Sequence, residues 1–309
     1  MMKLRLIHSY LLLGLGLLIA YTPMTQSAYK DDNDSATEFV REQLKATNFP
    51  DPDSVHVRFY KYYAATYRSW IYVPKSLIIV IAEKNNTEKF KTDENFEAWY
   101  NIKCIKESIY QELYSEVIEI IKNKNWAQEL NAIKDLIRQQ DEENYWVAQG
   151  TIDHEATHLT KNHTWTKENF YDASAKLALG YLAINAIITG LYSKSITSWA
   201  NDFILRSFNL FIVHKSANLC LSRNCEWEAD EGVRDDENIL RAKARWYAYH
   251  QKTKGPFPKN KLGAYGNYLW SCLCFADSTH PRSAARASRF NERADALVKQ
   301  QANQTETKG

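Results

Sequence analysis

Two histidines and a glutamate stand close together near the middle of the chain. Segment 153–163 contains the pattern H-E-x-x-H, made by His154, Glu155 and His158. Residues four apart share one face of a helix, so both imidazoles can direct a nitrogen at one metal ion. Neutral imidazole is a good ligand for Zn²⁺, and Glu155 is then placed to take a proton from a water molecule that the metal holds. The spacing predicts a metal-dependent hydrolytic site, but two histidines on a surface helix would give the same pattern.

A third ligand must come from another part of the chain, because a catalytic zinc usually takes three protein ligands. His163 lies five residues after His158 and would turn away from the two-histidine face of a continuing helix, which disfavours it. Segment 222–230 is the better candidate. Glu226 can complete a site of two histidines and one glutamate, and Asp230, four residues on, can accept the spare ring N–H of a ligating histidine. The alternative is a solvated acidic helix start.

The elements that position these residues are predicted to be mostly helical, with a small sheet. A capping pattern at 35–38 starts a helix that ends near residue 46. Runs of β-branched and aromatic residues predict strands at 55–63, 70–72 and 77–81. The last of these strands is expected to be buried and to offer an edge for pairing with an extended substrate.

Helical periodicity dominates the rest of the chain. Helices are expected at 93–122, 126–138, 141–162, 173–192, 203–213, 226–251 and 283–300, and loops at 83–88 and 255–266. The fold class is therefore α+β, with one domain over 29–300 and a flexible tail at 301–309. Segment 93–140 looks like a helical insertion before the two-histidine helix, and it is either a lid or extra scaffold.

Segment 173–192 is the most apolar part of the chain after the N-terminus. Lys176 and Asn185 interrupt it and leave it short of a comfortable membrane span, so we predict a buried helix. The alternative is a hairpin element that touches a membrane, which would give the protein a peripheral membrane contact.

Residues 1–28 have the features of a signal peptide. Lys3 and Arg5 form a positive start, 11–20 is apolar, and 25–28 offers small residues for cleavage after Ser27 or Ala28. No cysteine follows at that point, which disfavours a lipoprotein. We expect an exported protein, periplasmic or secreted; the alternative is a protein anchored by an uncleaved segment.

Composition excludes some classes of function. The chain has 309 residues, is 45% apolar and 25% charged, and carries a formal charge of only +2, so no field of one sign suggests nucleic acid. None of the five cysteines has the C-x-x-C spacing of a structural zinc site. A disulfide between the pair Cys220/Cys225 and the pair Cys272/Cys274 is a hypothesis that export permits; the alternative is buried, inert thiols.

Three separated blocks together resemble one protein family. H-E-x-x-H-x-x-x-x-H at 154–163, S-R-x-x-E-x-E-A-D at 222–230, and T-H-P with a later arginine at 279–286 resemble the HtpX/BepA-like zinc metallopeptidases, relatives of the CAAX prenyl protease. The resemblance covers about 55–296 and implies a gluzincin fold with one Zn²⁺ per chain. It also implies roles for individual residues: His154, His158 and Glu226 as ligands, Glu155 as general base and acid, Asp230 as a partner of a ligand, and His280 and Arg286 as the groups that face the substrate and stabilise the oxyanion.

The chain also departs from the family pattern. Thr157 stands where the family commonly has glycine, and Asp153 could bond near the site or face water. No helical repeats follow the catalytic region, and the paired membrane spans of the intrinsic members are missing. The function expected is a zinc endopeptidase that acts on protein or peptide substrates after export. The alternative is a non-proteolytic or latent metal-containing protein of the envelope, with a binding or chaperone-like role.

Overall fold

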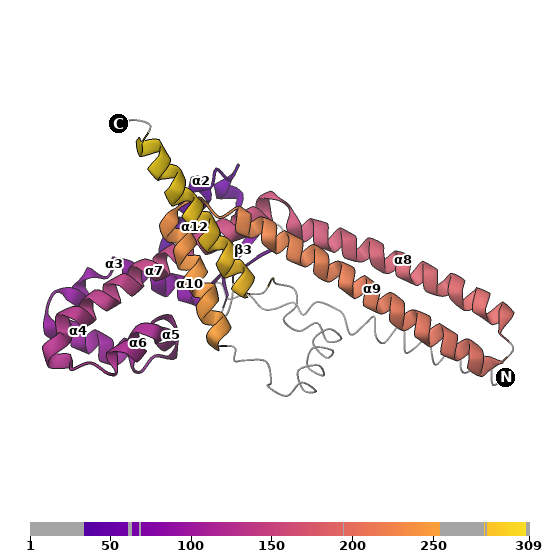
Figure 1. Cartoon of the computed structure of the whole chain (residues 1–309), viewed down its shortest axis with the longest axis horizontal. Coiled ribbons are helices and arrows are strands. Elements are labelled where there is room, and N and C mark those ends of the chain that lie inside the picture. Colours follow the sequence, from indigo (N-terminus) through magenta and orange to yellow (C-terminus); the bar gives the residue numbers. More distant parts are fainter. Residues whose placement is uncertain are drawn as a thin grey trace. The chain divides into compact units, whose positions relative to one another are not determined.

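A small sheet and a set of long helices make up the computed structural model, which describes residues 34–60, 64–67, 69–193, 195–253, 281 and 283–306 (Figure 1). The prediction of a mostly helical α+β fold is confirmed. The strands are β1 (His56–Tyr60), β2 (Ala65–Tyr67) and β3 (Trp70–Pro74). The helices are α2 (Asp34–Ala46), α3 (Lys75–Asn85), α4 (Asp93–Trp99), α5 (Ser108–Leu113), α6 (Ser115–Ile121), α7 (Trp126–Thr160), α8 (His163–Tyr192), α9 (Ile196–Glu231), α10 (Glu237–Thr253) and α12 (Ser283–Glu306), with short turns η1 (Pro52–Ser54), η2 (Thr87–Phe90) and η3 (Tyr100–Cys104).

The sheet has the strand order β1-β3-β2, with β1 parallel and β2 antiparallel to the central strand β3. Ile71 and Val73 of β3 are fully buried, whereas the residues beside them are partly exposed. Alternate side chains of a strand point to opposite faces, so one face of the sheet packs on the core. The edge strand β2 is tied to the start of α8, because Thr164 Oγ1 donates a hydrogen bond to Thr66 O at 3.3 Å.

The strand predicted at 77–81 is wrong, because these residues belong to helix α3. The chain leaves β3 at Pro74 and enters the helix at once. Leu77, Val80 and Ile81 are buried at the spacing of a helix face and pack in the same core as α7. The substrate-pairing edge expected there is therefore absent from this segment.

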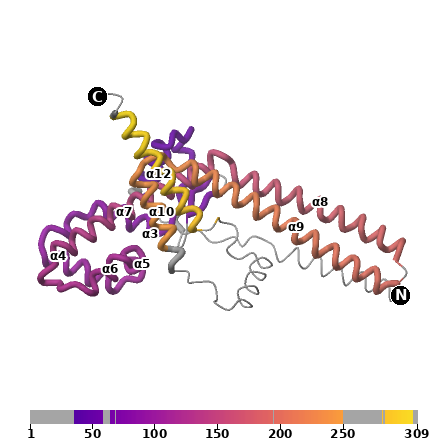
Figure 2. Tube along the Cα trace, viewed as in Figure 1, coloured from indigo at the N-terminus to yellow at the C-terminus, as the bar shows by residue number. Residues whose placement is uncertain are grey.

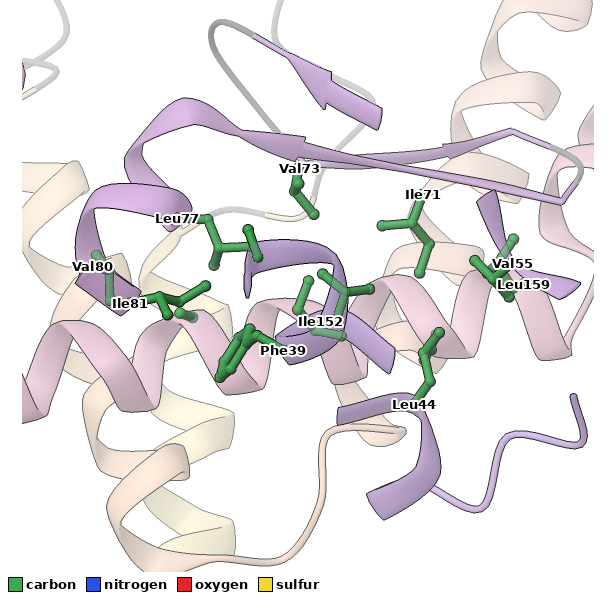
Figure 3. Close-up of a cluster of buried hydrophobic side chains, with 14 residues drawn as sticks. Phe39, Leu44, Val55, Ile71, Val73, Leu77, Val80, Ile81, Ile152 and Leu159 are labelled. Carbon is green, nitrogen blue, oxygen red and sulfur yellow. The ribbon is translucent and has the colours of Figure 1, made fainter. Parts of the chain in front are cut away.

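Helix α7 is the central element of the core and carries both histidines of the H-E-x-x-H motif. Its residues Ile152 and Leu159 pack with the sheet, α2 and α3 (Figure 3). Its first half contributes Ile133 and Ile137 to a second cluster, and Trp146 packs against a third cluster formed by α10 and α12. Contacts of this kind along most of its length fix the helix that must present the metal ligands.

Segment 93–140 encloses a hydrophobic cluster of its own instead of forming one long helix. It is divided into α4, η3, α5 and α6, which pack on the first half of α7. A buried ion-pair network closes this cluster: Lys89 Nζ lies 3.0 Å from Glu83 Oε2 and 2.8 Å from Asp141 Oδ2. The prediction of a polar loop at 83–88 is wrong in part, because α3 extends to Asn85 and η2 begins at Thr87. Glu83 is buried.

Several predicted boundaries differ from those observed. The helices predicted at 126–138 and 141–162 are one helix, α7, with a kink at Glu129. The helix predicted at 226–251 is divided, because α9 ends at Glu231 and α10 begins at Glu237. The last helix, α12, continues to Glu306, so most of the tail predicted at 301–309 is helical.

Helices α8 and α9 lie side by side as a long hairpin (Figures 1 and 2). The prediction of a buried helix over 173–192 is wrong, since most of its apolar side chains are exposed, with Leu177 at 75% and Leu191 at 77%. Among the described helices, α8 is the one that is long and apolar enough to cross a membrane.

Several predictions concern residues outside the described part of the chain: the signal peptide at 1–28, the loop at 255–266, Cys272, Cys274 and His280. Of the described cysteines, Cys104, Cys220 and Cys225 are free.

Candidate metal centre

Three buried side chains converge where α7 meets the last turns of α9. His154 Nε2 and His158 Nε2 lie 3.2 Å apart, one helical turn from each other on α7. Glu226 of α9 brings Oε2 to 3.3 Å from His154 Nε2 and Oε1 to 3.4 Å from His158 Nε2. All three side chains are almost completely shielded from solvent. Two distant segments of the sequence thus meet at one point.

This group could hold a metal ion. Ligands at about 2.0–2.1 Å from a tetrahedral ion stand about 3.3 Å from one another. The separations of 3.2, 3.3 and 3.4 Å match that value. Two imidazoles and one carboxylate also form a known donor set for a catalytic metal with an open fourth position. The residues therefore fit a metal ion in both geometry and chemistry.

Asp230 and Arg286 stand behind the first histidine. Asp230 Oδ1 lies 3.0 Å from His154 Nδ1, although no hydrogen bond of standard geometry forms there. Arg286 of α12 holds the same carboxylate with two hydrogen bonds, 2.6 Å from Nε to Oδ2 and 2.5 Å from Nη2 to Oδ1. Burial alone would raise the pKa of Asp230, but His154 and Arg286 hold it below its ordinary value. The carboxylate therefore stays charged beside the ring.

The same carboxylates act on His154 itself. Burial disfavours its protonated form, but Asp230 and Glu226 raise its pKa above the ordinary value. A proton therefore competes with a metal ion for this ring, as is general for metal sites.

His163 contacts the far nitrogen of the second histidine. The distance from His158 Nδ1 to His163 Nδ1 is 2.8 Å, and His163 Nε2 lies 3.1 Å from Glu228 Oε2. Helix α7 ends at Thr160 and Asn162 adopts a left-handed φ of 53°, which turns the chain back and starts α8 at His163. Spacing along a continuing helix could not reveal this contact. Partners of this kind fix the tautomer and orientation of a ligating histidine.

Glu155 lies beside the three candidate ligands and is buried. Its pKa is raised to about 7, mainly by burial; the charge of Glu226 adds to the rise, and His154 opposes it. A carboxyl group that titrates near neutral pH can both accept and release a proton under ordinary conditions.

Asp153 does not face water. It is fully buried and pairs with Arg234, whose Nε and Nη2 donate to its two oxygens at 2.7 and 2.6 Å. Arg234 also donates to Gln43 of α2 at 2.8 Å. This network fastens the turn between α9 and α10 to the two-histidine helix and so supports the approach of Glu226.

Thr157 occupies a space that Gly232 leaves open. A Cβ atom on Gly232 would lie 1.8 Å from Thr157 Oγ1 and 2.7 Å from Thr157 Cβ. Gly232 caps the end of α9, the helix that carries Glu226. The threonine between the two ligands is thus accommodated by a glycine on the facing helix, so α7 and α9 can still approach closely.

Of the residues predicted for the site, the structure brings together His154, His158, Glu226, Glu155, Asp230 and Arg286, with Arg286 Nη1 4.0 Å from Glu226 Oε2. His280 lies outside the described residues. No protein-family model matches the chain, and no curated protein or solved structure matches it significantly.

Proposed function

We propose that the chain is a zinc-dependent endopeptidase that hydrolyses peptide bonds of exported proteins. The observation that supports this best is the buried group of His154, His158 and Glu226 with Glu155 beside it. Imidazole and a single carboxylate suit zinc, whereas Mg²⁺ and Ca²⁺ prefer sites made of oxygen ligands. A binding scaffold would have no need of a buried proton acceptor at this position.

A zinc ion held there would act as a Lewis acid that acidifies water and polarises a substrate carbonyl. Glu155 takes the proton of the attacking water and delivers it to the leaving amine, for which its pKa of about 7 is well suited. Asp230 orients His154, and His163 with Glu228 orients His158. Arg286, fixed by Asp230, adds positive charge near Glu226, which favours the negative charge that develops on the carbonyl oxygen.

The family and the location are part of the proposal. The three sequence blocks at 154–163, 222–230 and 279–286 support an HtpX/BepA-like peptidase with a gluzincin fold. The charge and apolar pattern of residues 1–28 supports export. In this proposal His280 also faces the substrate oxyanion.

The test is whether the purified protein cleaves reduced, carboxymethylated casein. Casein is an unfolded substrate with many accessible peptide bonds. The wild-type protein should cleave it, a chelator should stop cleavage, and added Zn²⁺ should restore it. Glu155→Gln should keep the metal but lose at least about 10²-fold in rate, because it removes the general base. Glu168→Gln, an exposed change on α8, is the matched control.

Equal rates for Glu155→Gln and the wild-type protein would contradict the mechanism. Binding of casein by the zinc-loaded wild-type protein without cleavage would instead favour the non-proteolytic alternative.

A further inference from the structure

The hairpin of α8 and α9 exposes an unusual amount of apolar surface. Most of the exposed large hydrophobic side chains among the described residues lie on these two helices. Ile184 and Ile187 are 59% and 64% exposed, and Leu205 and Val213 on α9 are 60% and 64% exposed. A soluble protein rarely leaves so large an apolar surface to water, so this surface needs an occupant.

Polar groups occupy the interior of the hairpin. Asn185 and Thr189 are buried, and Arg206 Nη1 donates to Asn185 Oδ1 across the two helices at 3.2 Å. Trp199 Nε1 donates to Ala186 O at 3.1 Å, a second polar contact between the two helices. A hairpin in water buries apolar groups and exposes polar ones. Along 177–192 of α8 the arrangement is the reverse, which is typical of a helix that faces lipid.

The exposed apolar surface of α8 is also too broad for a groove on a partner protein. At about 100° per residue, the positions of Leu179, Ile187, Leu177 and Tyr181 point in directions that cover more than half of the helix circumference. A helix that docks in a groove presents one narrow stripe instead. Lipid chains, by contrast, contact every face that the neighbouring helix leaves open.

Length and charge agree with a bilayer. Residues 177–192 contain no charged side chain and form about 24 Å of helix, against a hydrocarbon core of about 30 Å. Charged residues of α8 gather at its other end, between Lys167 and Lys176. Tyr192 and Trp199 flank the tip, where aromatic rings favour a membrane interface. On α9, Asp202 and Arg206 are four apart on one face and can offset each other's charge.

We propose that the α8–α9 hairpin inserts its apolar end into a lipid bilayer. The candidate metal centre lies at the opposite end, where α8 begins at His163 and α9 carries Glu226. Along α8 that end is about 20 Å from the first residue of the uncharged stretch. The centre is thereby held close to the membrane surface but outside the hydrocarbon. This inference does not depend on the proposed hydrolysis.

The test is site-specific photo-crosslinking of the full chain in vesicles of phosphatidylcholine and phosphatidylglycerol. A benzophenone amino acid replaces either Ile188 of the hairpin or Ile120 of α6, whose side chains are equally exposed at 49% and 48%. Both variants keep the apolar N-terminal segment, so any tethering through it is common to the two. After irradiation, mass spectrometry of the peptides identifies the crosslinked partner.

We expect lipid adducts at position 188 and none above background at position 120. Crosslinks from position 188 to another copy of the chain would show that the hairpin is an association surface and would overturn the proposal. Absence of any adduct at 188, or equal lipid adducts at both positions, would overturn it as well.

Discussion

A single methyl group on Gly232 should weaken the metal centre without changing any ligand. The added Cβ would lie 1.8 Å from Thr157 Oγ1 and 2.7 Å from both Thr157 Cβ and Cγ2. Rotation of the threonine moves Oγ1 and Cγ2 but leaves Cβ in place, so the backbones of α7 and α9 must separate. Gly232 has an ordinary φ of −75°, so alanine would otherwise stabilise the chain by about 0.4–1 kcal/mol.

We expect Gly232→Ala to lower the free energy of unfolding by about 1–3 kcal/mol, the usual cost of overpacking. It should also weaken metal binding, because Thr157 adjoins His158 and Gly232 follows the helix of Glu226. Denaturant unfolding and competition with a chromophoric chelator measure the two effects. The same measurements on two double variants separate the cause.

Thr157→Gly in the Gly232→Ala background removes the clash and should restore metal affinity. Its free energy of unfolding should remain about 1 kcal/mol lower, because a glycine inside a helix is destabilising. Thr157→Ala should not restore it, since its Cβ still lies 2.7 Å from the new methyl group. The reasoning is refuted if Gly232→Ala is as stable as the wild-type protein, or if Thr157→Ala rescues as well as Thr157→Gly.

Three further changes test other parts of the structure. Burial, together with the nearby charge of Arg286, lowers the pKa of Lys243 from 10.5 to about 8. Between pH 8 and pH 10.5 the unfolded chain therefore binds a proton that the native state lacks. The free energy of unfolding consequently rises with pH over this range. The free energy of unfolding of Lys243→Met should therefore be about 3 kcal/mol higher than that of the wild-type protein at pH 7. A difference between the two proteins that does not narrow as the pH rises towards 10.5 would contradict this. Asp153→Asn breaks a buried ion pair and should cost about 3–5 kcal/mol in denaturant unfolding, and a loss below about 1 kcal/mol would mean that Arg234 finds another partner. His163→Phe keeps all three candidate ligands but should raise the dissociation constant for the metal about 10–100-fold, as measured by chelator competition. An unchanged dissociation constant would exclude a role of His163 in orienting His158.

The local chemistry of the candidate site could be predicted from spacing. Two histidines four residues apart on a helix share a face wherever that helix lies, and the structure places Glu226 of a second helix beside them. The contact of His163 could not be predicted, because it depends on the helix ending at Thr160 and on the left-handed turn at Asn162. The close packing of Thr157 against Gly232 could not be predicted either, because these two residues are far apart in the sequence.

The errors in the fold have physical causes. Residues 77–81 favour a strand by their β-branched side chains, but packing on α7 decides for a helix, as tertiary contacts commonly do. Composition predicts the apolar stretch 173–192 inside a core, because composition alone does not tell a buried apolar helix from an exposed one. The difference is seen only when α8 and α9 are placed together, with Asn185 held by Arg206 between them and the apolar side chains of α8 exposed.

Metal content tests the central claim most directly. The purified protein is dialysed against Zn²⁺ and then buffer, and bound metal is measured by mass spectrometry for the wild-type protein, Glu226→Ala, and the control Glu231→Ala, an exposed change on the same helix. We predict one zinc ion per chain in the wild-type protein and the control, and loss of the ion in Glu226→Ala. A wild-type protein without metal, or a Glu226→Ala variant that binds zinc as the wild-type protein does, would contradict the assignment of the metal centre.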